Sequence, residues 1–231
     1  NVYFGKPCGL MDQMASSVGN IITIDFADPA HPDVEPVAVD FSKAGLALCI
    51  LDSCADHADL TAEYAAIPTE MKQVAAEFGG KVLREVLPEQ VEEGIAALRG
   101  KVSDRAILRA LHFFDENQRV GEQVDALKKG DIDEFFRLII ASGESSWKLL
   151  QNVYVAGSTE EPLALALEMS RRMLEGKGAW RIHGGGFAGT ILTFVPNDML
   201  KTFRRKMAAV FGAHSCSALD IRHAGAIEGK I

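Results

Sequence analysis

The chain has 231 residues, of which 48% are hydrophobic and 24% are charged, so it has the ordinary composition of a globular protein with enough apolar material for a core. Its formal net charge of -8 argues against a nucleic acid or an anionic membrane as partner, because both bind clustered Lys and Arg. No apolar run reaches the length of a membrane span, and the first residues lack the basic start and apolar stretch of a signal peptide, which favours a cytoplasmic protein.

Cysteine usage points to the same compartment. The four cysteines show no CxxC spacing; they are Cys8, Cys49, Cys54 and Cys216. Zinc sites normally show such spacing, and disulfides are rare where the medium is reducing. We therefore expect buried, free thiols.

The first fifty residues predict one short helix and three strands. The helix is expected at residues 10–18, with Gly19 after its end, and the strands at residues 20–25, 34–41 and 46–51. Asp and Pro residues between positions 28 and 33 mark the turn that joins the first two strands. The third strand is a continuous apolar run, which is typical of a buried central strand.

Beyond residue 60 the pattern becomes mostly helical. Apolar residues recur at i, i+4 and i+7 from Ile107 to Phe114, and again from Val120 to Leu127, which predicts one long helix. Ser158 and Glu161 match a capping box just before Pro162. The expected helices are residues 60–78, 88–98, 104–127, one that begins at residue 132, 162–174 and 198–211, and the expected strands are residues 179–182, 191–195 and 216–221.

The order of these elements predicts the fold class. From residue 46 onward it is strand, several helices, two strands, helix and strand. This order indicates an α+β protein with a ferredoxin-like antiparallel sheet and helices packed on one face of it. Strand-and-turn sequence gives way to this unit near residues 41–45, so the expected domains are residues 1–42 and residues 43–231.

A glycine-rich stretch precedes the expected strand at residues 191–195. Gly184, Gly185, Gly186 and Gly189 fall within six residues. Such a cluster beside a strand indicates a tight backbone close to a ligand or to another backbone. Backbone N–H groups in a glycine-rich turn can hold phosphate oxygens, but neither a P-loop nor a Rossmann pattern is present. Phosphate binding and simple packing both remain open.

Asp12 is the first candidate for chemistry. It lies in the first turn of the expected helix at residues 10–18, where the helix dipole favours a carboxylate. A carboxylate in this place suits a general base or a metal ligand, and a plain first-turn acid is the alternative. The six histidines show no pair with metal-ligand spacing, so no metal site is predicted. His57 and His183 are expected to be structural or solvated.

Three short segments stand in a set order along the chain. The first is Gly5-Lys6-Pro7-Cys8-Gly9-Leu10-Met11-Asp12-Gln13, the second comprises Leu51-Asp52-Ser53, Asp56-His57 and Glu63-Tyr64, and the third runs from Arg181 to Thr190. Taken together, they resemble the galactokinases of the GHMP small-molecule kinase superfamily. The first is similar to the stretch with the catalytic aspartate, the second to the segment with a sugar-contacting tyrosine, and the third to the family's third, glycine-rich motif.

The resemblance implies a GHMP kinase fold, in which residues 1–42 are the last part of the N-terminal domain and residues 43–231 form the C-terminal domain. It implies ATP-dependent phosphorylation of the C1 hydroxyl of galactose, with Mg²⁺ offsetting phosphate charge. Asp12 would be the catalytic base, and Gly9 and Tyr64 would bind the sugar with it. The glycine motif would support the nucleotide loop through Gly184, Gly185 and Gly186.

The sequence also departs from the family. The first family motif and the Ser-rich phosphate loop are absent from it, so the main ligands of ATP and Mg²⁺ would be missing, and this chain alone is expected to be inactive. His183 stands where Thr or Ser is common, and Ala188 where Gly is common.

Two alternatives to a galactokinase stay open. One is a non-catalytic sugar-binding or dimerising module, with homo-oligomers formed through the exposed strand edges of residues 1–42. The other is a sibling kinase such as N-acetylgalactosamine kinase, whereas residues 7–13 favour galactokinase over mevalonate kinase. In the kinase interpretations the expected partners are a small sugar and ATP, with no nucleic acid and no membrane.

Overall fold

The computed structural model describes residues 9–39, 41, 43–54, 60–222 and 224–226. The expectations for Cys8, for His57 and for the turn at residues 5–8 lie outside these residues. Among the described helices, none combines the length and the apolarity that crossing a bilayer requires.

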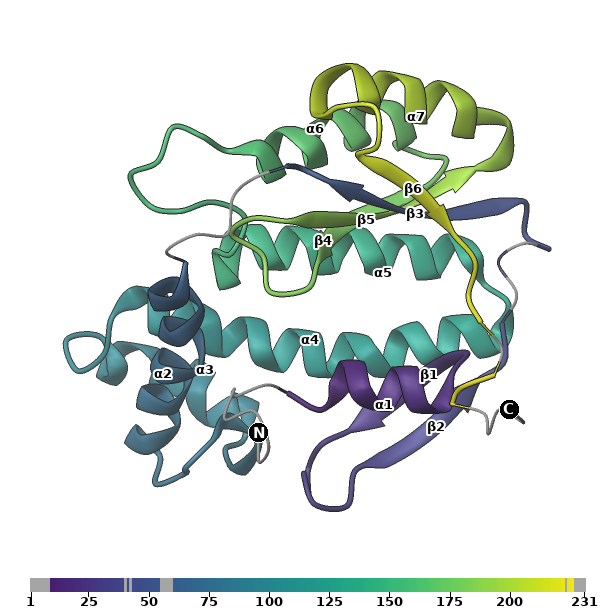
Figure 1. Ribbon diagram of the computed structural model, residues 1–231. Helices are drawn as coiled ribbons and strands as arrows, with labels where there is room; N and C mark the ends of the chain where they lie inside the picture. The colour runs from purple at the N-terminus through teal and green to yellow at the C-terminus, as the bar shows by residue number, and fades with distance from the viewer. Residues whose placement is uncertain (1–8, 40, 42, 55–59, 223, 227–231) are drawn as a thin grey trace.

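A four-stranded antiparallel sheet forms the centre of the molecule (Figure 1). Its strands are β3 (Leu46–Asp52), β4 (Ala179–His183), β5 (Thr190–Pro196) and β6 (Cys216–Leu219). They lie in the order β4-β5-β3-β6, and β3 pairs with β5 from Leu46 opposite Pro196 to Asp52 opposite Thr190. This order follows from a β-α-β-β-α-β chain path, so the predicted ferredoxin-like α+β fold is confirmed.

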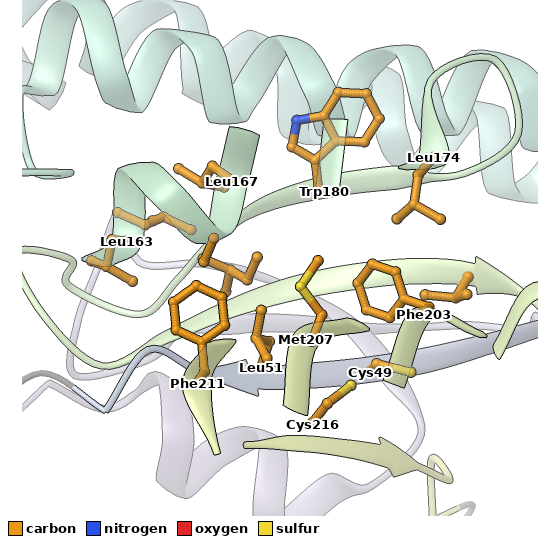
Figure 2. Packing of buried hydrophobic residues seen from close by; sticks show 14 of the residues in the cluster. Cys49, Leu51, Leu163, Leu167, Leu174, Trp180, Phe203, Met207, Phe211 and Cys216 are labelled. Atoms are coloured by element: carbon orange, nitrogen blue, oxygen red, sulfur yellow. The ribbon is translucent and has the colours of Figure 1, made fainter. Parts of the chain in front are cut away.

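Two helices cover one face of the sheet. They are α6 (Pro162–Leu174) and α7 (Asn197–Phe211), and Figure 2 shows the side chains that fill the space beneath them. Phe203 and Met207 of α7 are 0% exposed and pack in one cluster with Leu51 of β3 and Trp180 of β4. Burying each such side chain contributes roughly 1.5–3 kcal/mol to folding. Cys49 and Cys216 lie in the same cluster as buried free thiols, whereas Cys54 is a free thiol exposed to solvent.

The opposite face of the sheet is also covered, so the expectation of helices on one face was wrong. Helix α5 (Ile132–Ser145) lies against it, with α4 (Asp104–Lys129) beyond (Figure 1). Strand β5 shows why both faces need cover: Ile191 and Val195 join the cluster under α6 and α7, while Phe194 packs with Phe135 on the α5 side. A strand that is apolar at nearly every position exposes hydrophobic surface on both faces of its sheet.

The helical region between β3 and β4 follows the predicted pattern. It comprises α2 (Thr61–Glu77), the short 3₁₀ helix η1 (Leu83–Glu85), α3 (Pro88–Leu98), α4, α5, the π-helix η2 (Ser146–Leu150) and α6. The predicted capping box at Ser158 was wrong. The ring of Pro162 begins α6, so Glu161 is the N-cap residue and makes no side-chain cap, while the Ser158 hydroxyl accepts a hydrogen bond from the Glu160 N–H.

The N-terminal part of the chain forms a second, smaller sheet. Its two antiparallel strands are β1 (Ile21–Asp25) and β2 (Asp33–Val37), and the helix α1 (Met11–Val18) precedes them. Val37 and Phe41 pack with side chains of α4 and α5, such as Ala126 and Phe135. The two sheets are separate, and the division into domains at residue 42 stays a prediction.

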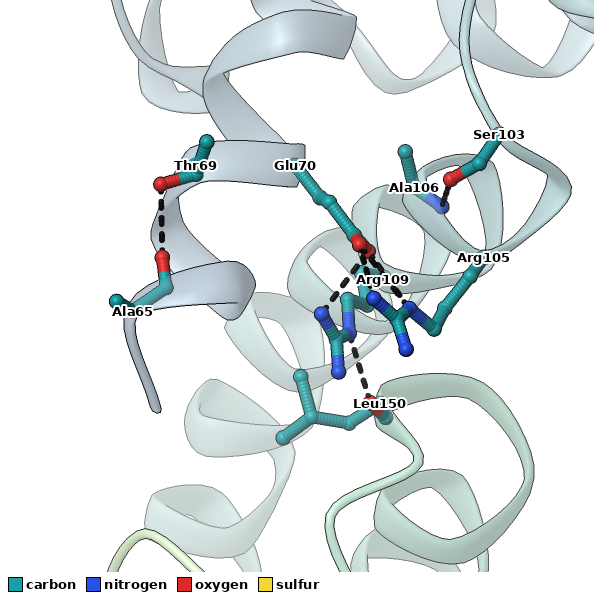
Figure 3. Close-up of polar contacts among 8 residues, drawn as sticks. All are labelled: Ala65, Thr69, Glu70, Ser103, Arg105, Ala106, Arg109 and Leu150. Carbon is teal, nitrogen blue, oxygen red and sulfur yellow. Dashed lines mark hydrogen bonds and ion pairs between the residues drawn. The ribbon is translucent and has the colours of Figure 1, made fainter. Parts of the chain in front are cut away.

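A buried ion pair joins α2 to α4 (Figure 3). The Arg109 side chain is 0% exposed, and its Nη1 lies 2.9 Å from Oε2 of Glu70. Glu70 also binds Arg105 at 2.5 Å. Arg109 Nε donates a hydrogen bond of 3.0 Å to the carbonyl of Leu150, at the end of η2. Arg109 therefore fixes the point where the chain leaves η2.

Removing the anion of this pair should destabilise the fold strongly. We expect Glu70→Ala to lower the free energy of unfolding by about 3–5 kcal/mol, because Arg109 would keep a buried charge without a counter-ion. Glu77→Ala on the same helix is the matched control, since it breaks an exposed ion pair with Lys101 and should cost no more than about 1 kcal/mol. Urea denaturation measures both values. Equal losses would contradict the stabilising role of the buried ion pair between Glu70 and Arg109.

Candidate functional site between helix α1 and the glycine-rich loop

The loop that joins β4 to β5 needs glycine at several positions. Gly184, Gly186 and Gly189 have φ angles of +77°, +83° and +88°, in the left-handed region that L side chains rarely adopt. A Cβ on Gly186 would also lie 2.1 Å from the carbonyl oxygen of Asn152. On Gly184, in contrast, a Cβ would meet nothing within 4 Å. The loop is therefore closed against the protein at Gly186 and open at Gly184.

Asn152 and Ser53 hold the loop from two sides. The buried Asn152 donates from Nδ2 to the carbonyl of Gly185 at 3.0 Å, and its own carbonyl accepts a hydrogen bond from the Phe187 N–H at 2.5 Å. The N–H and the hydroxyl of Ser53, just after β3, both donate to the carbonyl of Gly189, at 2.8 and 2.7 Å. These bonds satisfy the carbonyl groups of Gly185 and Gly189 and the N–H of Phe187, which lie in an irregular segment outside the strands.

Tyr64 supports the same loop from α2. Its hydroxyl donates to the carbonyl of Gly186 at 2.7 Å, and its ring packs edge-on against Phe187 with the centroids 5.4 Å apart. A Cβ on Gly185 would lie 2.6 Å from the ring. Burial raises the pKa of Tyr64, so the hydroxyl keeps its proton and remains a donor at neutral pH. The packing role of the glycine cluster is thus evident at Gly185 and Gly186.

A pocket of about 590 Å³ lies between the loop and the start of α1. Gly9 and Asp12 line it on the α1 side, and Gly184 and Gly185 on the loop side. The other lining residues are Met11, Gln13, Ile139, Arg181, Ile182, His183 and Leu192. The volume is within the range of small-molecule sites. Residues more than 170 positions apart in sequence therefore meet at one concave surface.

The polar side chains of β4 give this pocket a basic side. Arg181 and His183 alternate with the buried Trp180 and Ile182 and so lie on the face of β4 toward α5, where a Cβ on Gly143 would lie 3.2 Å from the Cβ of Arg181. Burial lowers the pKa of His183 most, and the guanidinium of Arg181 lowers it further, whereas Asp12 raises it. His183 is therefore neutral at pH 7. Burial is also the main cause that lowers the pKa of Arg181, ahead of the neighbouring Arg119 guanidinium.

The structure brings together part of the predicted site. Gly9, Asp12, Gly184 and Gly185 line one pocket, while Gly186 and Tyr64 lie outside its lining and form the support of the loop. Sequence reasoning missed Arg181 as a pocket residue, although the alternation of polar and apolar residues in β4 could have revealed it. It also missed Asn152, for which the local sequence carries no signal. Among the described residues, no three His, Cys, Asp or Glu side chains form a group that could hold a metal ion.

Two glycine variants test the asymmetry of the loop. Gly184→Ala should lower the free energy of unfolding by about 1–2 kcal/mol, the cost of a left-handed conformation for a residue with a Cβ. Gly186→Ala should lower the free energy of unfolding by about 1–3 kcal/mol more than Gly184→Ala does, because its Cβ would also collide with Asn152. Chemical denaturation of both variants checks the difference. A loss at Gly184 as large as that at Gly186 would refute it.

The proximity of Asp12 to His183 has its own test. Asp12→Asn removes the charge that raises the pKa of His183, so this pKa should fall below its wild-type value. NMR titration of the imidazole protons measures it. Asp133→Asn, at the equivalent second position of α5, is the control and should leave it unchanged. An unchanged His183 pKa in Asp12→Asn would mean that the two side chains do not interact.

The chain is similar in sequence to curated galactokinases over most of its length. No protein-family model matches the chain. The galactokinase of Glaesserella parasuis serovar 5 (strain SH0165) is 32% identical over 208 residues, which cover 90% of this chain and 52% of that protein. The galactokinase of Mycobacterium tuberculosis (strain ATCC 25177 / H37Ra) is 33% identical over 231 residues, which cover 97% of this chain and 59% of that protein.

Two solved structures share the fold. Lactococcus lactis galactokinase, complexed with galactose, matches with a TM-score of 0.73 and 22% identity over 96% of this chain and 56% of that one. L. major mevalonate kinase, in complex with R-mevalonate, matches with a TM-score of 0.59 and 16% identity over 97% of this chain and 55% of that one. The chain is therefore galactokinase-like in sequence, shares its fold with a galactokinase and a mevalonate kinase, and spans a little over half the length of the galactokinases it matches.

Proposed function

We propose that the whole protein is an ATP-dependent sugar kinase that phosphorylates the C1 hydroxyl of galactose. The observation that carries this proposal is the meeting of Asp12 with the glycine-rich loop at one pocket. The similarity to curated galactokinases over 90% or more of this chain supports the same reaction. Asp12, Gly9 and the loop are the parts of the reaction site that this chain would supply.

Asp12 is the proposed catalytic base. It is the second residue of α1, in the first turn, where the helix dipole stabilises a carboxylate. From there it would accept, or orient, the proton of the C1 hydroxyl while the hydroxyl oxygen attacks the terminal phosphate. Phosphoryl transfer depends mostly on positioning and charge stabilisation, and a positioned base contributes roughly 10²–10⁴-fold.

The basic side of the pocket suits an anionic partner. Arg181 stays protonated at neutral pH and would offset phosphate charge, while the neutral His183 can donate or accept a hydrogen bond. Gly184 leaves the backbone open at the same wall, which fits a nucleotide phosphate better than a packed turn would. Gly9 and Tyr64 remain the proposed sugar contacts, and ATP is the proposed phosphate donor.

Mg²⁺ needs ligands beyond those described here. Magnesium is usually held by one or two carboxylates, water and substrate phosphates. Of the described residues that line the pocket, Asp12 is the one carboxylate, and this residue already has the role of the base. The described lining of the pocket therefore holds no second carboxylate that could serve a metal ion.

The role of Asp12 can be tested in a chimera. The N-terminal part of the Glaesserella parasuis galactokinase would precede Asn1, and ATP-dependent phosphorylation of galactose would be followed. We expect Asp12→Ala to lower kcat by roughly 10²–10⁴-fold, because the hydroxyl would lose its base. Asp133→Ala removes an acid from the same position of α5 and should leave kcat within about twofold, as exposed substitutions away from a site usually do.

The outcomes separate the alternatives. Wild-type kcat in Asp12→Ala would exclude Asp12 as the base. A chimera that unfolds cooperatively but phosphorylates no galactose would contradict the proposed reaction, and activity on N-acetylgalactosamine alone would replace the substrate. The alternative is that this chain, made by itself, is a non-catalytic module. Calorimetry with ATP and Mg²⁺ should then give no binding, and micromolar binding by this chain alone would oppose that view.

A further inference from the structure

Helix α1 carries Asp12 but has little packing of its own. None of its side chains is buried, although it has eight residues, Met11 to Val18. An isolated helix of this length is unstable in water, so contacts outside the helix must hold it. Its described contacts with other elements are mainly to β1, the strand that follows it directly. A neighbour in sequence fixes only the end of α1 and leaves its orientation toward the glycine-rich loop to other contacts.

The chain after β6 supplies such contacts at the end of α1. In Figure 1 the yellow segment leaves β6, passes α5 and α4, and reaches α1 and β1. The Asn20 N–H donates to the carbonyl of Arg222 at 2.8 Å, and the Ala226 N–H donates to the carbonyl of Ser17 at 3.0 Å. Arg222 Nη2 also donates a long hydrogen bond, 3.5 Å, to the carbonyl of Ser16.

These hydrogen bonds satisfy carbonyl groups at the C-terminal end of α1. The last four carbonyls of a helix lack partners within it, and Ser16 and Ser17 are among them in α1. A cation near this end also opposes the negative end of the helix dipole. The last turn of α1 contains no basic residue of its own, so Arg222 brings the charge from more than 200 positions away.

Two glycines allow the chains to approach so closely. A Cβ on Gly225 would lie 1.9 Å from the carbonyl oxygen of Ser17, and a Cβ on Gly19 would lie 2.5 Å from the carbonyl carbon of Ala224. Both clashes are with backbone atoms, which cannot turn aside as a side chain can. Because Gly19 also has a φ of +75°, an L side chain there is strained in any case, and Gly225 is the cleaner position to test.

We propose that Arg222 and residues 224–226 form a C-terminal strap that positions Asp12 by holding α1 against the domain of the glycine-rich loop. The strap continues from β6, which pairs with β3, and the residue that follows β3, Ser53, binds the loop at Gly189. The strap that contacts α1 and the glycine-rich loop are thus both connected to strand β3 of the same sheet. Ser17 is five positions after Asp12, about 7.5 Å along a helix that moves as a rigid unit. The catalytic part of this inference rests on the proposed function of Asp12.

The strap itself can be tested without any activity. In the chain as it is, Gly225→Ala should make the amides of α1 and of Asn20 exchange with solvent deuterium at least about tenfold faster, because the strap can no longer seat. Gly121→Ala is the matched control: it is the same change in α4, at a glycine whose Cβ would meet nothing within 4 Å. The control should leave exchange in α1 unchanged. Unaltered exchange in Gly225→Ala would overturn the strap.

The effect on Asp12 is measured in the chimera. Gly225→Ala should lower kcat by about tenfold to a hundredfold, as small displacements of catalytic groups do, and change KM for ATP by less than about twofold. In an Asp12→Ala background the same change should have less than about a twofold effect, because nothing remains for the strap to position. A loss that is equal in both backgrounds would overturn positioning through Asp12. An inactive wild-type chimera would count against the proposed reaction only, since the exchange measurement decides the strap.

Discussion

The buried charge of Arg109 links helix α2 to the segment that supports the glycine-rich loop. A guanidinium without solvent contact needs an anion, and Glu70 of α2 supplies it. The same side chain binds the carbonyl of Leu150, which ends η2. Gln151 then takes a left-handed conformation, with φ of +57°, and Asn152 follows, on which the glycine-rich loop docks. The shape of the loop therefore depends on a charge pair in another part of the helical region.

The pocket combines two elements that differ greatly in how they are supported. The loop side is held by Asn152, Ser53 and Tyr64, each bonded to a loop carbonyl. The side of α1 has no buried side chain, and the hydrogen bonds at its end include those from the Arg222 side chain to Ser16 and from the Ala226 N–H to Ser17. The glycine-rich loop is fixed by several hydrogen bonds, whereas α1 has few contacts. The position of Asp12 relative to the loop therefore depends on the contacts at the end of α1.

Most secondary structure could be predicted because its signals are local. The spacing of Ile107, Leu111 and Phe114 already indicated α4, and the apolar run at residues 191–195 indicated β5. Two predictions failed, one for a local reason and one because the outcome depended on another element. Ser158 matched a capping box, yet Pro162 sets the start of α6. The sheet was expected to have one covered face, yet α5 packs against the other, because β5 is apolar on both.

The amino-acid sequence by itself determined the fold class, the glycine-rich turn before β5, and the resemblance to galactokinases. These follow from periodicity, backbone freedom and motifs, which are properties of residues near one another in the chain. Only the tertiary structure decided that Arg181 lines the pocket, that Tyr64 stands behind the loop, and that Arg222 reaches α1. Such contacts join residues far apart in sequence, and they exist only after the sheet has brought its strands together.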